Sequence, residues 1–241
     1  MDRNTAKILP SKDSKKLKDV SVAILNAGLG ARIKSCEPRS LIKIKDKLII
    51  DWQLDAIKFA FEKPDIVTVV GCKPHRVFKK IGEKVRIVEN QLYETTNNSE
   101  SLRLAFNASV TSNFIFLHGD LVFNRDLLAE INYHESFVVV DSTGMMKKNE
   151  VGLVEADGKL SVLSYGLEKK WCQIAFFTGK ELSLLRNIFN KFNQTDKKML
   201  SFELLNQIIS DGGSFKCIEP KHMKILEIDT IKDAKNEDIN F

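Results

Sequence analysis

Short apolar runs alternate along the first half of the chain with segments whose apolar positions recur at helical spacing. The apolar runs predict strands at 20–25, 66–71, 85–89, 114–118 and 137–141. Helical spacing predicts helices over 51–62, 99–108 and 126–133. Strands that alternate with helices are typical of a mostly parallel sheet flanked by helices, so we expect an α/β fold.

The pattern changes after Val151. Residues 152–160 alternate around Asp157-Gly158, which predicts a hairpin with a tight turn, and a second β-rich portion is expected around 174–177, followed by a helix at 201–210. The sequence contains no linker rich in Pro, Gly or Ser and no internal repeat. We therefore expect residues 20–241 to form one domain whose second half is a β-rich insertion.

Composition adds limits to this picture. The chain has 241 residues, of which 43% are hydrophobic, so it can bury a core without help from metals or disulfides. Its four cysteines form no CxxC pair, which argues against a zinc site and predicts reduced thiols, as in a cytoplasm. No apolar run approaches the roughly 20 residues that a membrane span needs, so we expect no membrane insertion.

The net charge of +5 is modest, and many lysines lie near the N-terminus. Residues 1–19 contain Lys7, Lys12, Lys15, Lys16 and Lys18 among polar residues. This composition predicts a flexible basic tail. Nucleic-acid binding is the weaker alternative, because no platform of aromatic and basic residues accompanies the lysines.

A glycine-rich stretch follows the first apolar run. It consists of Leu25, Asn26, Ala27, Gly28, Leu29, Gly30, Ala31 and Arg32. Two glycines let the backbone approach an anion, and the guanidinium groups of Arg32 and Arg39 match phosphate oxygens in pairs. A dinucleotide loop would need a third glycine where Ile33 stands, and a Walker loop would end in Gly-Lys-Ser/Thr. The stretch predicts a nucleotide-binding loop of another kind; an ordinary strand-loop-helix turn is the alternative.

Acidic residues occur at two further points. Asp120 ends the apolar run at 114–118, and ligands of open α/β sheets collect beyond the carboxyl ends of strands. A carboxylate there suits Mg²⁺, although it could also be an N-cap or turn aspartate. Residues 225–230 alternate like a strand, which places Glu227 and Asp229 on one face. Either could complete a metal site with Asp120.

Residues 90–102 are rich in amides and hydroxyls. Gln91, Asn97 and Asn98 can donate and accept hydrogen bonds at once, as reading a pyrimidine edge requires. We take them, with Ser99, as candidate nucleotide-binding residues. A turn that caps the helix beginning near Ser99 is the alternative.

Together these segments resemble the nucleotidyltransferases that make NDP-sugars and CDP-alcohols, over roughly residues 20–235. Residues 27–32 match the pattern Ala-Gly-x-Gly-x-Arg, and residues 90–102 are similar to the Asn-x-x-Tyr-x-x-Thr-Asn-Asn-x-x-Ser-Leu region of phosphocholine (LicC-like) cytidylyltransferases. The family's phosphate-contacting lysine is replaced by Arg39, and Lys43 is a candidate to assist it.

This resemblance implies a Rossmann-like, GT-A-type fold and an EC 2.7.7 type activity. The acceptor's phosphate or phosphonate oxygen would attack the α-phosphorus of CTP and release pyrophosphate. The resemblance also assigns Mg²⁺ to Asp120 and Asp229, and catalytic roles to these two residues with Arg32 and Arg39. It implies a cytoplasmic enzyme, monomeric or homodimeric, that serves capsule or other cell-surface polysaccharide synthesis.

The acceptor is the least determined part of this prediction. Tyr165, Trp171 and Phe176 are candidate acceptor-binding residues, because aromatic faces attract quaternary ammonium groups; aromatic core packing is the alternative. A sugar-1-phosphate nucleotidyltransferase and a non-catalytic nucleotide-binding regulatory protein remain the alternatives to a phosphocholine-like cytidylyltransferase.

Overall fold

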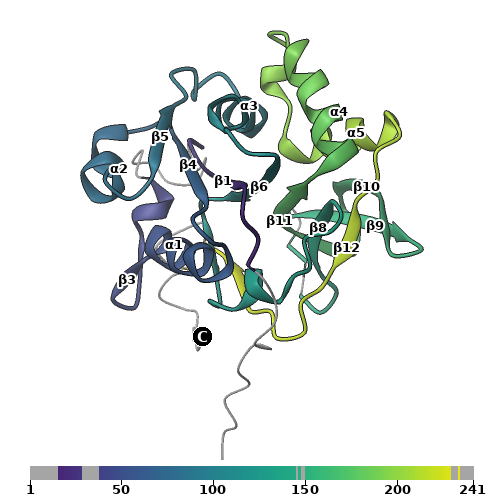
Figure 1. The fold of residues 1–241 in the computed structure, drawn as a ribbon, viewed down its shortest axis with the longest axis horizontal. Helices are drawn as coiled ribbons and strands as arrows, with labels where there is room; N and C mark the ends of the chain where they lie inside the picture. The colour runs from purple at the N-terminus through teal and green to yellow at the C-terminus, as the bar shows by residue number, and fades with distance from the viewer. Residues whose placement is uncertain (1–15, 29–37, 145, 148–149, 229–232, 234–241) are drawn as a thin grey trace, which may run out of the picture.

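The computed structural model describes residues 16–28, 38–144, 146–147, 150–228 and 233. A nine-stranded sheet crosses the whole molecule in the order β5-β4-β1-β6-β11-β8-β12-β10-β9 (Figure 1). Its first part is parallel and consists of β5 (Arg86–Glu89), β4 (Asp65–Val70), β1 (Val20–Asn26) and β6 (Asn113–His118). The carboxyl ends of these strands therefore meet at one edge of the sheet.

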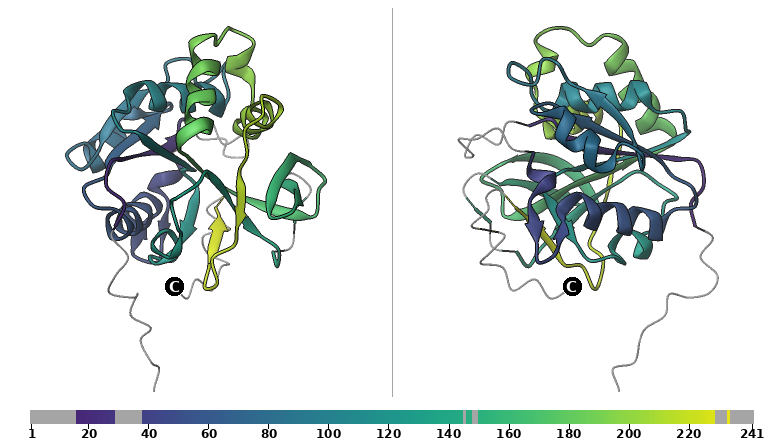
Figure 2. Two further views of the ribbon diagram at one scale, coloured as in Figure 1. Left: turned by 45° about the vertical axis from the view of Figure 1, so that its right-hand side comes forward. Right: turned by 90° about the vertical axis from the view of Figure 1, so that its left-hand side faces the viewer.

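Helices cover both faces of the sheet, as the two turned views show (Figure 2). The strands send alternate side chains to opposite faces: Val22 and Ile24 of β1 join one core, and Ala23 and Leu25 join the other. The first core is closed by α1 (Ile49–Ala60) and α2 (Pro74–Ile81). The second is closed by α3 (Asn98–Ala108), α4 (Gly179–Asn190) and α5 (Ser201–Ser210).

The second part of the sheet is mainly antiparallel and closes on itself. It contains β8 (Phe137–Asp141), β9 (Val151–Ala156), β10 (Lys159–Tyr165), β11 (Lys169–Phe177) and β12 (Lys216–Ile218). Because β9 pairs with β11 as well as with β10, these strands form a small barrel-like ring. Asp157 (φ 51°) and Gly158 (φ 75°) make the tight turn between β9 and β10.

Short elements complete the architecture. Two small sheets pair β13 (Ile225–Glu227) with β7 (Leu121–Phe123), and β2 (Lys43–Ile44) with β3 (Lys47–Leu48). Three 3-10 turns are η1 (Arg39–Leu41), η2 (Leu127–Glu130) and η3 (Asp196–Lys198). In the described part of the chain, no helix has the length and apolar character that a bilayer span requires.

The expected α/β fold and its β-rich second half are confirmed. The five predicted strands of the first half, the 152–160 hairpin and the helices at 51–62, 99–108 and 201–210 are present with small shifts of their ends. The helix predicted over 126–133 is wrong, because only the 3-10 turn η2 forms there. Helices α2 and α4 were not predicted. A C-terminal strand is present at β13, and the remainder of the predicted segment, from residue 229, lies outside the described residues.

Two further expectations change. Residues 1–15 of the predicted tail lie outside the described residues, whereas the tail's last part contacts the domain: Leu17 pairs with Phe61, and Asp19 accepts a hydrogen bond from the backbone N–H of Ser112. The prediction of four reduced thiols is wrong for Cys72, which is disulfide-bonded. Cysteines that are scattered along a sequence can be neighbours in the fold, so spacing alone did not reveal this bond.

Candidate active site

A pocket of about 330 Å³ opens at the carboxyl ends of β1 and β6. Most of its lining comes from three segments far apart in sequence: the end of β1, the region from Asn90 to Ser101 that leads into α3, and the turn after β6; Arg39 of η1 and Leu200 before α5 complete it. The lining residues are Leu25, Asn26, Ala27, Gly28, Arg39, Asn90, Tyr93, Glu94, Thr96, Asn97, Asn98, Ser101, His118, Gly119, Asp120 and Leu200. The pocket therefore lies where an open α/β sheet is expected to bind its ligand.

The turn His118-Gly119-Asp120 is held tightly against β1. The N–H of Gly119 donates to the carbonyl of Leu25 at 3.0 Å. A Cβ atom at position 119 would lie 1.6 Å from Oδ1 of Asn26, so only glycine fits there. From α1, the buried amide of Gln53 donates to the carbonyls of His118 and Leu121, each at 2.9 Å. These contacts fix the backbone that carries Asp120.

Asp120 is almost fully buried, and its two carboxylate oxygens differ. Oδ2 lies 2.6 Å from Nη1 of Arg39, at the start of η1. Oδ1 is buried and has no hydrogen-bond partner among the described residues. An unpaired carboxylate oxygen is costly in a buried position, and a cation ligated there would satisfy it. Asp120 therefore fits the predicted role of a metal ligand.

The segment predicted to supply a second ligand runs beside Asp120. Strand β13 pairs with β7, and the N–H of Ile228 donates to the carbonyl of Asp120 at 2.9 Å. Asp229 itself lies outside the described residues. Glu227 accepts a hydrogen bond at Oε2 from the Gln173 amide at 2.6 Å, which already engages one of its oxygens. Within the described residues, no three His, Cys, Asp or Glu side chains gather as a metal-binding group.

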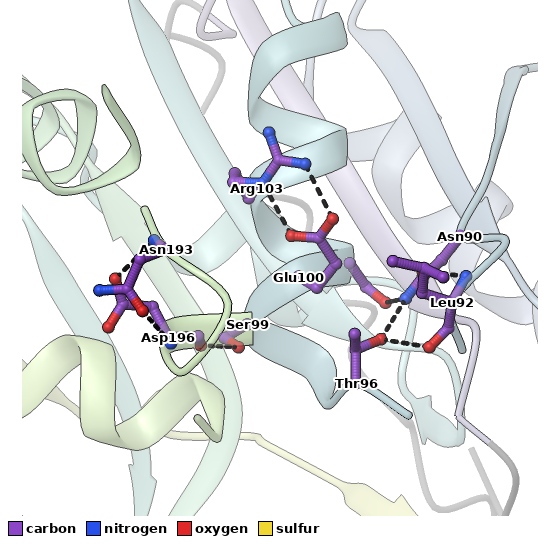
Figure 3. A network of polar contacts seen from close by, with 9 residues as sticks. Asn90, Leu92, Thr96, Ser99, Glu100, Arg103, Asn193 and Asp196 are labelled. Atoms are coloured by element: carbon purple, nitrogen blue, oxygen red, sulfur yellow. Dashed lines mark hydrogen bonds and ion pairs between the residues drawn. The ribbon is translucent and has the colours of Figure 1, made fainter. Parts of the chain in front are cut away.

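The loop before α3 is shaped by its own side chains (Figure 3). The buried amide of Asn90 donates to the hydroxyls of Thr96 and Ser101, and its Oδ1 accepts from the N–H of Leu92. The Thr96 hydroxyl in turn donates to the Leu92 carbonyl at 2.7 Å. Asn90 thus acts as the internal support of the loop that lines this side of the pocket.

The two predicted base-reading asparagines also bind protein groups. Nδ2 of Asn97 donates to the carbonyl of Lys198 at 2.5 Å, and Oδ1 of Asn98 accepts from the N–H of Ser201 at 2.6 Å. Ser99 is fully buried and donates to the carbonyl of Asp196 at 2.9 Å (Figure 3). These bonds attach the start of α3 to the segment between α4 and α5. The predicted side-chain cap of α3 is absent, because Asn97 makes no capping hydrogen bond.

His118 is enclosed by aromatic and polar neighbours. Its ring packs edge-on against Trp171, and its Nε2 lies 3.2 Å from the Ser201 hydroxyl and 3.3 Å from Nδ2 of Asn98. Burial lowers the pKa of His118; the negative charge of Asp120 raises this pKa, and the positive charge of Arg39 lowers it. The lowered pKa favours the neutral form of the ring.

The structure brings many predicted nucleotide-binding residues to one pocket. Leu25, Asn26, Ala27, Gly28, Arg39, Asn97, Asn98 and Asp120 line it. Gln91 and Lys43 are exposed and are not part of the lining, and Ser99 is buried against η3, so the predicted ligand contacts of these three are not supported. Leu29, Gly30, Ala31 and Arg32 lie outside the described residues.

The structure does not gather Trp171 and Phe176, two of the three aromatic candidates for acceptor binding, into one group. Trp171 is buried in the core under α4 and α5, whereas Phe176 is buried on the opposite face with Phe137 and Tyr133. The two rings are separated because β11 sends them to different faces of the sheet. Tyr165 is half-exposed and stacks edge-on with Phe202. The alternative interpretation, core packing, describes Trp171 and Phe176.

Three residues of the site were missed by sequence reasoning. Gln53 and Asn90 support the two sides of the pocket from buried positions, and Gln173 bridges β11 and β13. A glutamine among the apolar residues of a helix was a usable signal for Gln53, because a buried amide must find partners. Gln173 stands in an apolar run, between Cys172 and Ile174, which is a similar signal, but its left-handed backbone could not be read from it.

Comparisons with known proteins agree with this arrangement. No protein-family model matches the chain. The bifunctional protein GlmU of Thermoanaerobacter pseudethanolicus is 30% identical over 113 residues, which are 46% of this chain and 24% of that relative. The chain thus spans about a quarter of the length of the curated relative that it matches.

Solved structures match nearly the whole chain. A CTP:phosphocholine cytidylyltransferase from Streptococcus pneumoniae (LicC) is 22% identical, with a TM-score of 0.69 over 90% of this chain and 97% of that one. A putative glucose-1-phosphate thymidylyltransferase from Bacillus anthracis is 14% identical, with a TM-score of 0.72 over 92% and 97%. The chain therefore has the nucleotidyltransferase fold, and the resemblance in the sequence is confirmed at the level of the fold.

Proposed function

We propose that this chain, folded as nucleotidyltransferases are, transfers a nucleotidyl group from a nucleoside triphosphate to a phosphorylated acceptor and releases pyrophosphate. The observation that carries the proposal is Asp120. It combines a position at the end of β6, a buried carboxylate oxygen without a partner in the described residues, and an ion pair with a pocket-lining arginine. A cation bound together with nucleotide phosphates accounts for all three features.

Mg²⁺ fits this place as the cofactor, held by Asp120 and, in our proposal, by Asp229. When bound, it would neutralise phosphate charge and polarise the phosphorus under attack. Glu227 is the less suitable second ligand, because its Oε2 already accepts the bond from Gln173. We therefore retain Asp229, which directly follows the residue bonded to the Asp120 backbone.

The chain's own groups would bind and orient the substrates. Arg39 lies at the pocket wall. When a nucleotide binds, its guanidinium can leave the carboxylate of Asp120 and pair with phosphate oxygens instead. The loop at 28–32 would bind the same phosphates through backbone N–H groups. The acceptor's phosphate is already an anionic nucleophile, so no general base is needed, and positioning and charge neutralisation supply the rate.

We further propose CTP as the nucleotide and a phosphocholine-like compound as the acceptor. The similarity of residues 90–102 to cytidylyltransferases supports this choice, together with the fold shared with the pneumococcal phosphocholine enzyme. The fold shared with the thymidylyltransferase supports a sugar 1-phosphate as the second candidate acceptor. A role in the synthesis of capsule or other surface polymers, in the cytoplasm, rests on the same resemblance.

The test is pyrophosphate release in the presence of Mg²⁺. CTP, UTP, dTTP and GTP are each combined with phosphocholine, phosphoethanolamine, aminoethylphosphonate and glucose 1-phosphate. Release with CTP and a phosphorylated amine is the expected result. Release with glucose 1-phosphate would favour the sugar enzyme, and release with no pair, while CTP still binds, would favour a non-catalytic nucleotide-binding protein.

A further inference from the structure

Strand β11 contains an unusual backbone conformation beside the site. Gln173 has a φ of 58°, in the left-handed region, and the pairing of β11 with β8 shifts register between Trp171 and Ala175. This is a β-bulge in the middle of a long strand. Residues with side chains rarely adopt this conformation, and Gln is not among the types that favour it. The surrounding structure must therefore hold Gln173 in place.

The side chain of Gln173 links two neighbouring elements. Its Nε2 donates to Oε2 of Glu227 in β13 at 2.6 Å, and the imidazole of His118 is a further polar neighbour of its amide. His118 lies alongside because β11 and β6 are antiparallel neighbours, with Ile174 opposite Leu117. The bulge adds residues to β11 opposite β8, and from within it Gln173 reaches β13.

The bonds continue on the other side of His118. Its Nε2 lies within hydrogen-bonding distance of Asn98, a pocket-lining residue of α3, and of Ser201 in α5. Polar side chains therefore follow one another from Asn98 through His118 to Gln173, and a hydrogen bond joins Gln173 to Glu227. This series begins at the pocket wall assigned to the nucleotide and ends one residue before Ile228, whose N–H binds the Asp120 backbone.

We propose that Gln173 is a positioning residue for the acceptor: from its left-handed bulge it orients Glu227 and the β13 segment beside Asp120. This inference rests on the proposed function. Gln173 and Glu227 do not line the pocket formed by the 25–28 and 90–101 segments, and they lie on the far side of the His118–Asp120 turn. They also adjoin Lys170, whose charge interacts with Glu227. This is the side left for the acceptor.

The strain itself supports a functional role. A glycine at position 173 would adopt the same backbone without steric cost, yet the chain carries a glutamine there. Such strain clusters at ligand sites, and Gln173, unlike the exposed Lys63 with a φ of 53°, is partly buried and bonded to Glu227. A residue kept for fold stability alone would gain from replacement by glycine, whereas a positioning residue would lose activity.

The experiment separates these two outcomes. In Gln173→Gly the backbone strain is relieved and the amide removed, and the matched control is Lys63→Gly, an exposed loop position with a φ of 53°. Both variants should keep or gain thermal stability. In Gln173→Gly, the KM for phosphocholine should rise about tenfold, as expected for one lost hydrogen bond to a charged group, while the KM for CTP stays within about twofold. Lys63→Gly should leave both constants unchanged.

A rescue pair tests the bond between the two side chains. Gln173→Glu places two carboxylates against each other and should raise the phosphocholine KM as strongly as the glycine variant. The double variant Gln173→Glu/Glu227→Gln restores a donor and an acceptor in reversed order. It should recover most of the wild-type KM, which a general loss of folding would not allow.

Three results would overturn the inference. The first is a phosphocholine KM within twofold of wild type in Gln173→Gly; the second is an equal rise in the KM values for both substrates; the third is a double variant no better than Gln173→Glu. Each leaves the proposed function intact, because wild-type turnover is measured in the same assay. If wild type turns over glucose 1-phosphate instead, that compound replaces phosphocholine in the series. Absence of turnover with every acceptor overturns the proposed function and this inference together.

Discussion

The two halves of the sheet present their polar groups in different ways. In the parallel half, the pocket is lined by strand ends and short loops whose amides bind backbone groups, and Asp120 keeps one buried oxygen without a partner among the described residues. In the barrel-like half, charged side chains pair with one another: Lys170 with Glu150, and Lys169 with Glu155. The pocket in the parallel half keeps a carboxylate oxygen available for a ligand's charge, whereas these charged side chains of the barrel-like half satisfy one another.

This contrast indicates how the two halves can change. In the parallel half, the backbone supplies the geometry, so we expect a few charged residues to determine the proposed activity. In the barrel-like half, replacing one charged residue also leaves its former partner with an unpaired charge, which destabilises the fold. We therefore expect that a change of acceptor preference would require paired substitutions in the barrel-like half. A change in the handling of the nucleotide would require only single substitutions in the parallel half.

The strongest test of the contrast is Asp120→Asn. It keeps the shape of the side chain but removes the charge that Arg39 and the proposed Mg²⁺ require, so turnover should fall by about 10³-fold or more. Circular dichroism should show a folded protein. The matched control is Asp126→Asn, an exposed residue near the same strand, which should keep wild-type activity. Measurable Mg²⁺-dependent turnover close to wild type in Asp120→Asn would remove the metal assignment.

The next largest effect is expected in the barrel-like half. Lys170→Met leaves the buried Glu150 carboxylate without its partner, and should lower the free energy of unfolding by about 3 kcal/mol. Lys169→Met, whose partner Glu155 is more exposed, should cost about 1 kcal/mol or less. Urea denaturation measures both values. Equal losses in the two variants would show that burial does not distinguish these pairs.

Arg39→Lys tests the departure from the family's lysine. The positive charge is kept but the forked geometry is lost, so the KM for CTP should change by about tenfold or less. The lysine would also face Asp120 with a single ammonium group in place of the guanidinium. The Mg²⁺ concentration that gives half-maximal turnover should then differ from that of wild type. Steady-state kinetics with varied CTP and Mg²⁺ give both numbers. Loss of all activity in Arg39→Lys would mean that the guanidinium fork itself is indispensable.

The smallest effect concerns pH. Burial lowers the pKa of His118 in the folded protein, so the unfolded chain binds more protons than the folded one below about pH 6.5. The contribution of His118 to the free energy of unfolding is therefore fully present above about pH 6.5 and is lost as the pH falls below that value. Wild type should therefore lose more stability than His118→Gln between pH 7.5 and 5.5 in urea titrations. The same loss in both proteins would assign the pH dependence to other groups.

The sequence predicted the parallel half well for a physical reason. An apolar run that ends in Asp120 is a local pattern, and parallel strands bring such ends together. The roles of Asn97, Asn98 and Ser99 were not predictable, because their partners lie at 196–201, about 100 residues away. Gln173 was equally hidden, since a left-handed bulge depends on the pairing of β11 with its neighbours and leaves no mark in residue type.

The closure of β9 onto β11 also affects how molecules of this protein can meet. The ring joins β9 to β11 over two residue pairs and β10 to β12 over one, while the opposite end of the sheet is the outer edge of β5. That edge is four residues long, and its Arg86 is fixed by Asp65 and by the carbonyl of Ala108. Short, charged edges discourage strand addition. Addition of a strand from another molecule at the β5 edge is therefore disfavoured.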